Sequence, residues 1–170
     1  MRIVQVLPYD ARWSLQFEKE RTLLGTTLGR DAIHHIGSTS VVGLAAKPII
    51  DILIETEDIG RFSIHDAELT RLGYEPRGEL GIPGRRFYPK GGELRTHHVH
   101  AFQRGDQLIL RHLAFRDYLI GHPEVAAEYG ALKTTVAAAC NNDINRYMDG
   151  KDAWIKRIEH LAILEHKATA

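Results

Sequence analysis

The stretch HIGSTSVVGLAAKPIIDILIE, residues 35–55, decides the fold of this chain. It joins the end of a short apolar run, residues 32–36, to a stronger run, residues 48–55, through a loop of small residues. Runs of β-branched residues bounded by glycine and proline predict strands. A strand as apolar as the second is covered on both faces, where a carboxylate is costly unless a cation or hydrogen-bond donors meet it. Asp51 lies in the middle of that strand and is therefore our candidate catalytic residue.

The loop between the two predicted strands has the chemistry of a phosphate-binding site. Gly37 allows the backbone to approach a ligand closely. Ser38, Thr39 and Ser40 offer hydroxyl groups, and their backbone N–H groups are able to form an anion-binding concavity. Lys47 adds a positive charge. An ordinary turn with hydroxyl capping is the alternative interpretation, and the carboxylate on the next strand favours the functional one.

The rest of the chain divides into a mixed half and a helical half. The predicted elements are a helix over 10–29, a helix over 65–72, an extended run over 74–80, strands over 85–88 and 95–103 joined by a glycine turn at 90–92, and helices over 106–121, 123–140 and 151–166. We therefore expect an α+β fold, with a small mixed or antiparallel sheet flanked by an N-terminal helix and a helical C-terminal half.

Three histidines lie on the second of the later strands. Because side chains alternate along a strand, His98 and His100 point to one face and His97 points to the apolar face. We predict that His98 and His100 converge on Asp51 as ligands of a divalent metal ion. Two imidazoles and one carboxylate suit Zn, Mn or Fe better than Mg, which prefers oxygen ligands. A solvated or hydrogen-bonded strand face is the alternative interpretation.

The composition of the chain is that of an ordinary globular domain. Its 170 residues fit a single domain, 1–170. The 22 basic and 22 acidic side chains balance, so the electrostatic footprint of a dedicated nucleic-acid binder is missing. The lone Cys140 forms no internal disulfide and is interpreted as a buried apolar residue. No stretch has the length of a signal-peptide core or a membrane span, so we expect a cytoplasmic protein without a membrane partner.

Several motifs together resemble the GrpB family, also called UPF0157. They are HIGSTS at 35–40, GLAAKPIIDI at 43–52, HVH at 98–100, FRDYL at 115–119 and HPE at 122–124. The resemblance covers nearly the whole chain. It implies a fold of the nucleotidyltransferase superfamily, whose pattern is Gly-Ser at the end of one strand and an acid-x-acid pair on the next. It also implies a pocket for a nucleotide or a phosphorylated small molecule with Mg, Mn or Zn as cofactor.

The sequence departs from the superfamily pattern at one position that matters. Two residues after Asp51, where the second carboxylate of the pair is expected on the same strand face, this chain has Leu53. Nucleotidyl transfer normally uses two or three carboxylates to hold two Mg²⁺ ions. Val42, where the family usually has proline, is a milder departure that concerns loop stiffness.

Two further groups of basic residues are candidates for phosphate binding. Arg85 and Arg86 follow a glycine-rich turn, and Arg86 is preferred because it matches an Arg-x-Phe-like position of the family. On the helical side, we expect Arg116 to be oriented by a neighbouring carboxylate, Asp117. Lys133 follows Tyr129 by one helical turn and is also a candidate.

For Arg85 and Arg86, a solubilising surface charge is the alternative interpretation, and for Arg116 and Lys133 the alternative is pairing on a helix surface.

Three functions are compatible with these residues. The first is a metal-dependent nucleotidyltransferase with an unknown acceptor, in which Asp51 holds the cation. The second is a non-catalytic module that binds a ligand or assists a partner enzyme. Family members occur fused to a dephospho-coenzyme A kinase, which implies a partner in coenzyme A metabolism. The third is a metal-dependent hydrolase built on Asp51, His98 and His100.

Overall fold

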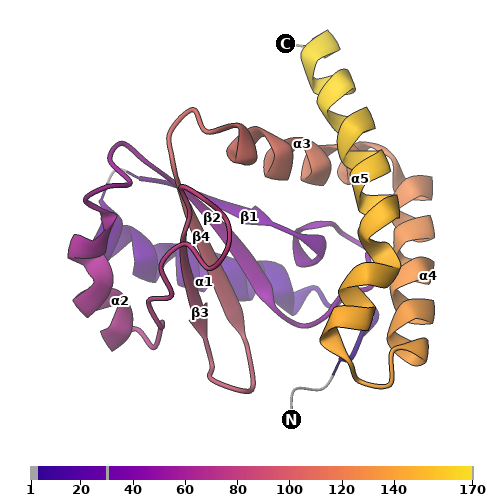
Figure 1. Cartoon of the computed structure of the whole chain (residues 1–170), viewed down its shortest axis with the longest axis horizontal. Helices are drawn as coiled ribbons and strands as arrows, with labels where there is room; N and C mark the ends of the chain where they lie inside the picture. Colours follow the sequence, from indigo (N-terminus) through magenta and orange to yellow (C-terminus); the bar gives the residue numbers. More distant parts are fainter. Residues whose placement is uncertain (1–3, 30, 170) are drawn as a thin grey trace.

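The computed structural model describes residues 4–29 and 31–169, so residues 1–3, 30 and 170 of the expected single domain lie outside this part. Figure 1 shows the order of the elements along the chain. They are α1 (Arg12–Leu28), β1 (Ala32–Ile36), the 3-10 helix η1 (Ser38–Ser40), β2 (Ile50–Thr56), the 3-10 helix η2 (Phe62–His65), α2 (Asp66–Arg71), β3 (Arg86–Lys90), β4 (His97–Gln103), α3 (Gln107–Gly121), α4 (Pro123–Ala139) and α5 (Ile144–Thr169).

The described strands form one mixed sheet of four strands in the order β1-β2-β4-β3. β1 and β2 are antiparallel, β2 and β4 are parallel, and β4 and β3 are antiparallel. The parallel pair places Asp51 opposite His98 and Leu53 opposite His100. The predicted α+β class is therefore confirmed, and so is the glycine-turn hairpin that joins β3 to β4.

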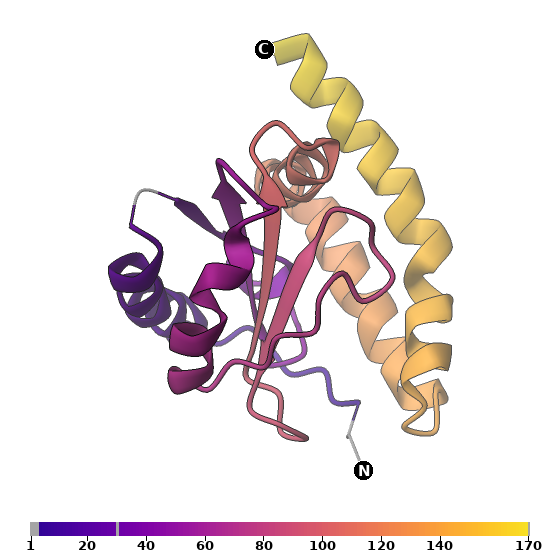
Figure 2. The ribbon, with the colours of Figure 1, turned by 60° about the vertical axis from the view of Figure 1, so that its left-hand side comes forward.

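The two faces of the sheet have different partners because side chains alternate along each strand. On one face, Ile52 and Val99 pack with α1 and α2 in the main hydrophobic core. Leu53 and Phe102 point to the other face, where Ile109 of α3 covers them. Figure 2 shows α1 and α2 on one side of the sheet and the C-terminal helices on the other. Asp51 belongs to the second face, which also carries the candidate functional site.

Helix α5 begins earlier than the sequence predicted, at Ile144 rather than near Lys151. Asp143 Oδ1 accepts hydrogen bonds from the backbone N–H groups of Asn145 and Arg146 and so satisfies the free donors of the first turn. Gly150 lies inside the helix, where glycine is normally unfavourable. A Cβ atom at Gly150 would lie 2.6 Å from Val136 Cγ1 of α4, so the close contact between α4 and α5 requires glycine there.

Two other sequence predictions need correction. The run 74–80 was expected to be extended, but it contains only an isolated bridge between Tyr74 and Lys90. It follows β3 through the hydrogen bonds from Glu75 N–H to Pro89 O and from Arg77 N–H to Phe87 O, and then turns away. At the N-terminus of α1, the regular helix starts at Arg12 rather than directly after Asp10.

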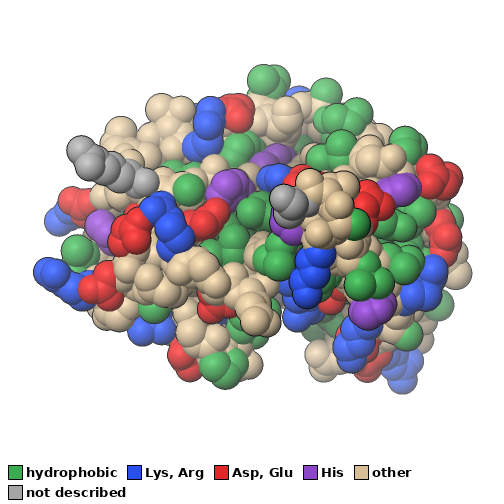
Figure 3. Space-filling view, turned by 90° about the horizontal axis from the view of Figure 1, so that it is seen from above, with side chains coloured by type: hydrophobic (Ala, Val, Ile, Leu, Met, Phe, Trp, Pro, Cys, Tyr) green, Lys and Arg blue, Asp and Glu red, His purple; other side chains and the backbone are tan. Residues whose placement is uncertain are grey.

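The surface agrees with the balanced composition. In the space-filling view of Figure 3, basic and acidic side chains are interspersed over the face that is seen. Cys140 is buried, with 2% exposure, as predicted. Among the described residues, no helix has the length and apolar character needed to cross a membrane.

Candidate functional site

The Gly-Ser turn after β1 lies directly against the carboxylate of β2. Gly37 has φ 70° and ψ −174°, a conformation that is essentially restricted to glycine. A Cβ atom at this position would lie only 2.7 Å from Asp51 Oδ2. Gly37 is therefore required twice, for its backbone conformation and for the close approach of the carboxylate. Asp51 Oδ2 faces the turn whose hydroxyl and N–H groups were predicted to bind phosphate.

Gly37→Ala is expected to destabilise the fold by roughly 1–3 kcal/mol and to displace Asp51, because the new methyl group meets Oδ2. Gly43→Ala is the matched control, since Gly43 also has a positive φ, 81°, but a Cβ atom there meets nothing within 4 Å. Urea unfolding measures both costs. Equal losses of stability in the two variants would contradict the close contact between Gly37 and Asp51.

Asp51 and two histidines of β4 form a compact group of potential metal ligands. His98 Nδ1 lies 3.2 Å from Asp51 Oδ1, and His100 Nε2 lies 3.6 Å from the same oxygen. One ligand atom from each residue lies within 4.8 Å of the others. The predicted convergence of His98 and His100 on Asp51 is thus confirmed as geometry. The donor set fits a divalent cation, which Asp51 would hold together with imidazole nitrogen.

The carboxylate of Asp51 is held in its charged form. Its side chain keeps 29% exposure because it borders a cavity. Burial by itself would raise the pKa of Asp51, but the contacts with His100 and His98 outweigh burial and lower the pKa well below its ordinary value. Burial lowers the pKa of His100 as well. The group therefore combines a carboxylate with a neutral imidazole at neutral pH.

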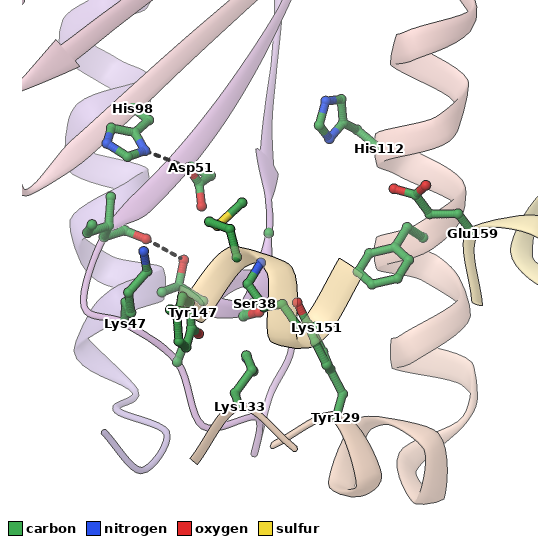
Figure 4. Close-up of a pocket in the computed structure, with 16 residues that line it drawn as sticks. Ser38, Lys47, Asp51, His98, His112, Tyr129, Lys133, Tyr147, Lys151 and Glu159 are labelled. Atoms are coloured by element: carbon green, nitrogen blue, oxygen red, sulfur yellow. Dashed lines mark hydrogen bonds and ion pairs between the residues drawn. The ribbon is translucent and has the colours of Figure 1, made fainter. Parts of the chain in front are cut away.

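Beside this group, a cavity of about 310 Å³ separates the sheet from the C-terminal helices. Figure 4 shows side chains from both walls directed toward its interior. The sheet side contributes Asp51 and His98, and the Gly-Ser turn contributes Ser38. The opposite wall and the loop before β2 contribute a cluster of lysines and tyrosines, namely Lys47, Tyr129, Lys133, Tyr147 and Lys151.

The three lysines lie close together in a poorly hydrated environment. Lys47 Nζ and Lys151 Nζ lie 5.0 and 5.4 Å from the centroid of the Tyr147 ring. Lys133 is only 2% exposed, and its Nζ atom has no hydrogen-bond partner in the described part of the chain. Burial, with smaller effects of Lys151 and Lys47, lowers the pKa of Lys133 to about 7. Burial and Lys47 lower the pKa of Lys151 to about 8.

The remaining predicted phosphate ligands lie at different distances from the cavity. Thr39 lines it, and its hydroxyl group is within 2.9 Å of His35 Nε2. The Ser40 hydroxyl donates to Gly37 O and so supports the turn from within. The helix-surface alternative for Lys133 is wrong, because this residue is buried at the cavity wall.

None of the three candidate arginines, Arg85, Arg86 and Arg116, lines the cavity. Arg116 forms the expected ion pair with Asp117, at 2.7 Å, but its Nη1 atom donates to His35 O and braces β1. Arg86 hydrogen-bonds the carbonyl group of Arg85 and lies 3.9 Å from Glu79. Alternation along β3 places Arg86 on the face opposite Phe87, whose ring packs against His98 and His100. The preference for Arg86 over Arg85 was therefore wrong, because the Arg86 side chain lies on the sheet face away from His98 and His100.

Sequence reasoning missed four polar residues of the cavity, which are His112, Tyr147, Lys151 and Glu159. His112 belongs to α3, and burial lowers its pKa to about 4. Tyr147 and Lys151 are four residues apart on α5, a spacing that places both on one helix face. This signal was lost because the predicted helix started at Lys151.

The fold and the site together define a class of protein. A mixed sheet of an α+β fold carries a Gly-Ser turn after one strand and a partly buried carboxylate on the next. Helices on the far side of this carboxylate close a cavity lined by lysines. The chain belongs to the GrpB family, because the family described as GrpB protein matches residues 3–161.

Known proteins of similar sequence and structure support the same assignment. The UPF0157 protein YqkA of Bacillus subtilis is 48% identical over 95% of this chain and 48% of its own length. The crystal structure of the conserved protein GrpB from Enterococcus faecalis has 47% identity and a TM-score of 0.91, covering 95% of this chain and 99% of that chain. This chain thus spans about half the length of the Bacillus relative.

A more distant relative is larger and is described as a dephospho-CoA kinase. It comes from Mycolicibacterium paratuberculosis and is 26% identical over 90% of this chain and 44% of its own length.

Proposed function

We propose that this chain is a nucleotidyltransferase-like protein that binds a nucleotide or another phosphorylated small molecule together with a divalent cation. The single observation that carries the proposal is the pairing of two clusters across one cavity. The cluster of potential metal ligands around Asp51 lies on one wall, Lys133 and Lys151 lie on the other, and Lys47 joins them from the loop before β2. A phosphate chain between the walls would satisfy both at once.

The lysine cluster favours a ligand with several negative charges. A buried ammonium group without an anionic partner is costly, and the lowered pKa of Lys133 reflects that cost. An anion that enters the cavity restores the charged form of Lys133 and Lys151 and receives charge-assisted hydrogen bonds from them. Ser38 and the backbone of the Gly-Ser turn offer further donors beside Asp51.

A divalent cation bound at Asp51 would neutralise phosphate charge and polarise a phosphoryl oxygen. The residues of the chain then perform the remaining work. The lysines hold and orient the phosphate groups, and Gly37 keeps the carboxylate and the turn in contact. The helices α4 and α5 line one side of the cavity through Tyr129, Lys133, Tyr147 and Lys151. This arrangement suits transfer of a nucleotidyl or phosphoryl group to a substrate hydroxyl in line with the leaving group.

A thermal-shift screen tests the proposal. The purified protein is heated with ATP, CTP, GTP or UTP, each alone and with Mg²⁺, Mn²⁺ or Zn²⁺. A ligand that binds only the folded state raises the melting temperature by mass action, and about 2.7 kcal/mol of stabilisation is expected at a hundredfold excess over Kd. We expect a shift that needs both nucleotide and cation. No shift with any combination would refute a nucleotide as the ligand.

A non-catalytic role is the second candidate, and Leu53 favours it. Leu53 is fully buried between β4 and α3, at the place where a second carboxylate is expected for two-metal catalysis. The similarity to the larger dephospho-CoA kinase suggests a module that assists a partner enzyme of coenzyme A metabolism. The two candidates differ in the effect of Asp51→Asn. Loss of nucleotide turnover supports the enzyme, whereas loss of a partner's stability alone supports the module.

A further inference from the structure

Arg85, which the sequence ranked below Arg86 as a candidate, is a buried residue beside the site. It is 7% exposed, and its guanidinium group lies 4.7 Å from the centroid of the Phe87 ring. Its Nε atom donates to Glu79 O at 3.2 Å, and Nη2 donates to Leu80 O at 3.0 Å. Two carbonyl groups and an aromatic ring therefore fix the plane and the position of this guanidinium group.

The segment that supplies these carbonyl groups is strained. Leu80 has φ 42°, a left-handed conformation that is unfavourable for a residue with a branched side chain. Its side chain is 58% exposed and gains little from packing. Strain of this kind persists only where surrounding contacts impose it. The hydrogen bond from Arg85 to Leu80 O is one such contact. It ties the position of the Arg85 guanidinium group to the backbone conformation of Leu80.

The remaining nitrogen of the Arg85 guanidinium group, Nη1, faces His100. Arg85 Nη1 lies 3.4 Å from His100 Nδ1, with the N–H directed at the ring nitrogen. An arginine is always a donor, so Nδ1 must be the acceptor. A neutral imidazole that accepts at Nδ1 carries its proton on Nε2. His100 Nε2 is the atom that lies 3.6 Å from Asp51 Oδ1, so its N–H faces the carboxylate.

This arrangement excludes His100 as a ligand while Arg85 stays in place. A metal-bound histidine needs the lone pair of its ligating nitrogen and donates its other N–H to an acceptor. For His100, ligation through Nε2 would place an N–H at Nδ1 directly against the N–H of Arg85. The ring of His98 differs, because among the described residues it hydrogen-bonds only Asp51, and either tautomer is available to a cation.

We infer that Arg85 fixes His100 as the Nε2–H tautomer, so that His100 orients Asp51, and that only Asp51 and His98 ligate the cation directly. The inference rests on the proposed function and refines its cation site. With two protein ligands, most of the coordination shell is left to phosphate oxygens and water, the ligands that a divalent cation such as Mg²⁺ usually keeps beside a nucleotide. His100 is thus a positioning residue, and it does not replace the carboxylate that is missing at Leu53.

The tautomer is measured first, on the cation-free protein. Long-range ¹H–¹⁵N NMR of imidazole-labelled protein reports which nitrogen of His100 carries the proton. We expect the proton on Nε2 in the wild type. A proton on Nδ1 would overturn the inference, and this measurement does not depend on whether the protein binds a nucleotide.

Calorimetric titration with Zn²⁺ alone then tests the ligand assignment through a double-mutant cycle. In the wild-type background, His100→Gln is expected to change the Zn²⁺ affinity less than threefold, because the glutamine amide keeps an N–H donor for Asp51, whereas His98→Gln removes a direct ligand and weakens the affinity at least tenfold. In Arg85→Met, His100 is free to ligate, so the affinity rises, and adding His100→Gln removes that gain. A gain that persists in the double variant reflects removed charge alone and contradicts the inference.

The remaining outcomes are also decisive. A loss of at least tenfold in His100→Gln alone would make His100 a direct ligand and overturn the assignment. If Arg85→Met does not fold, the Zn²⁺ affinities of His98→Gln and His100→Gln and the tautomer of His100 in the wild type still test the inference. Wild-type protein that binds no Zn²⁺ and shows no cation-dependent shift with nucleotide would overturn the cation site itself. His160→Gln, an exposed histidine on α5, controls for nonspecific binding.

Discussion

Asp51→Asn is expected to lose the cation-dependent thermal shift with nucleotide almost entirely. Removing even an outer-shell partner of a metal ligand typically weakens affinity 10–100-fold, and Asp51 is the one carboxylate in the group. An amide of the same shape keeps the contact with Gly37 but carries no charge to hold a cation. The melting temperature with nucleotide and Mg²⁺ or Mn²⁺ is the measurement, and the ligand-free melting temperature reports folding.

Asp149→Asn is the matched control for this variant, because Asp149 is an exposed carboxylate on α5, next to the cavity residue Met148. It should retain the whole shift. If Asp51→Asn and Asp149→Asn behave alike, the cation does not bind at Asp51, and the proposed site is wrong.

Lys133→Met is expected to have two opposite effects. Without ligand, the variant should be more stable than the wild type by roughly 1–3 kcal/mol, the usual cost of a buried polar group without a hydrogen-bond partner. Nucleotide binding should weaken about 10–100-fold, because a charge-assisted hydrogen bond of about 1.5–3 kcal/mol is lost. Lys156→Met changes an exposed lysine of α5 and should alter neither property. Denaturant unfolding and calorimetry measure the two effects.

The gain in stability of Lys133→Met should become smaller as the pH rises. The folded-state pKa of Lys133, about 7, lies below the ordinary value of 10.5, so the unfolded chain binds more protons between these two values. The cost of burying Lys133 is therefore complete below pH 7 and fades as the pH rises toward 10.5. The advantage of Lys133→Met should shrink over the same window. An advantage that is constant from pH 6 to pH 10 would show that packing, and not charge, explains it.

Strand alternation is the part of the site that could be predicted from the sequence. It placed His98 and His100 on one face and His97 on the other, and the structure confirms both. The prediction succeeds because a period of two is a property of the extended backbone itself. The same rule placed Leu53 on the face of Asp51, and the structure buries it there.

Alternation also shows why Arg86 was preferred wrongly. The two arginines are neighbours in the sequence, so the start of the strand decides which of them faces Asp51. The family resemblance favoured Arg86, but its side chain lies on the other face of β3. Arg85 reaches His100 because the turn at Glu79 and Leu80 folds back and holds it.

By itself, the sequence determined the fold class, the Gly-Ser turn and the carboxylate of β2, because these depend on local backbone preferences and on one costly buried charge. Only the tertiary structure decided what faces that carboxylate. Lys133 and Lys151 come from two different helices, and the contact of Gly150 with Val136 sets how closely those helices pack. The lysines form one cluster because long-range packing removes them from water, and no local pattern in the sequence encodes that proximity.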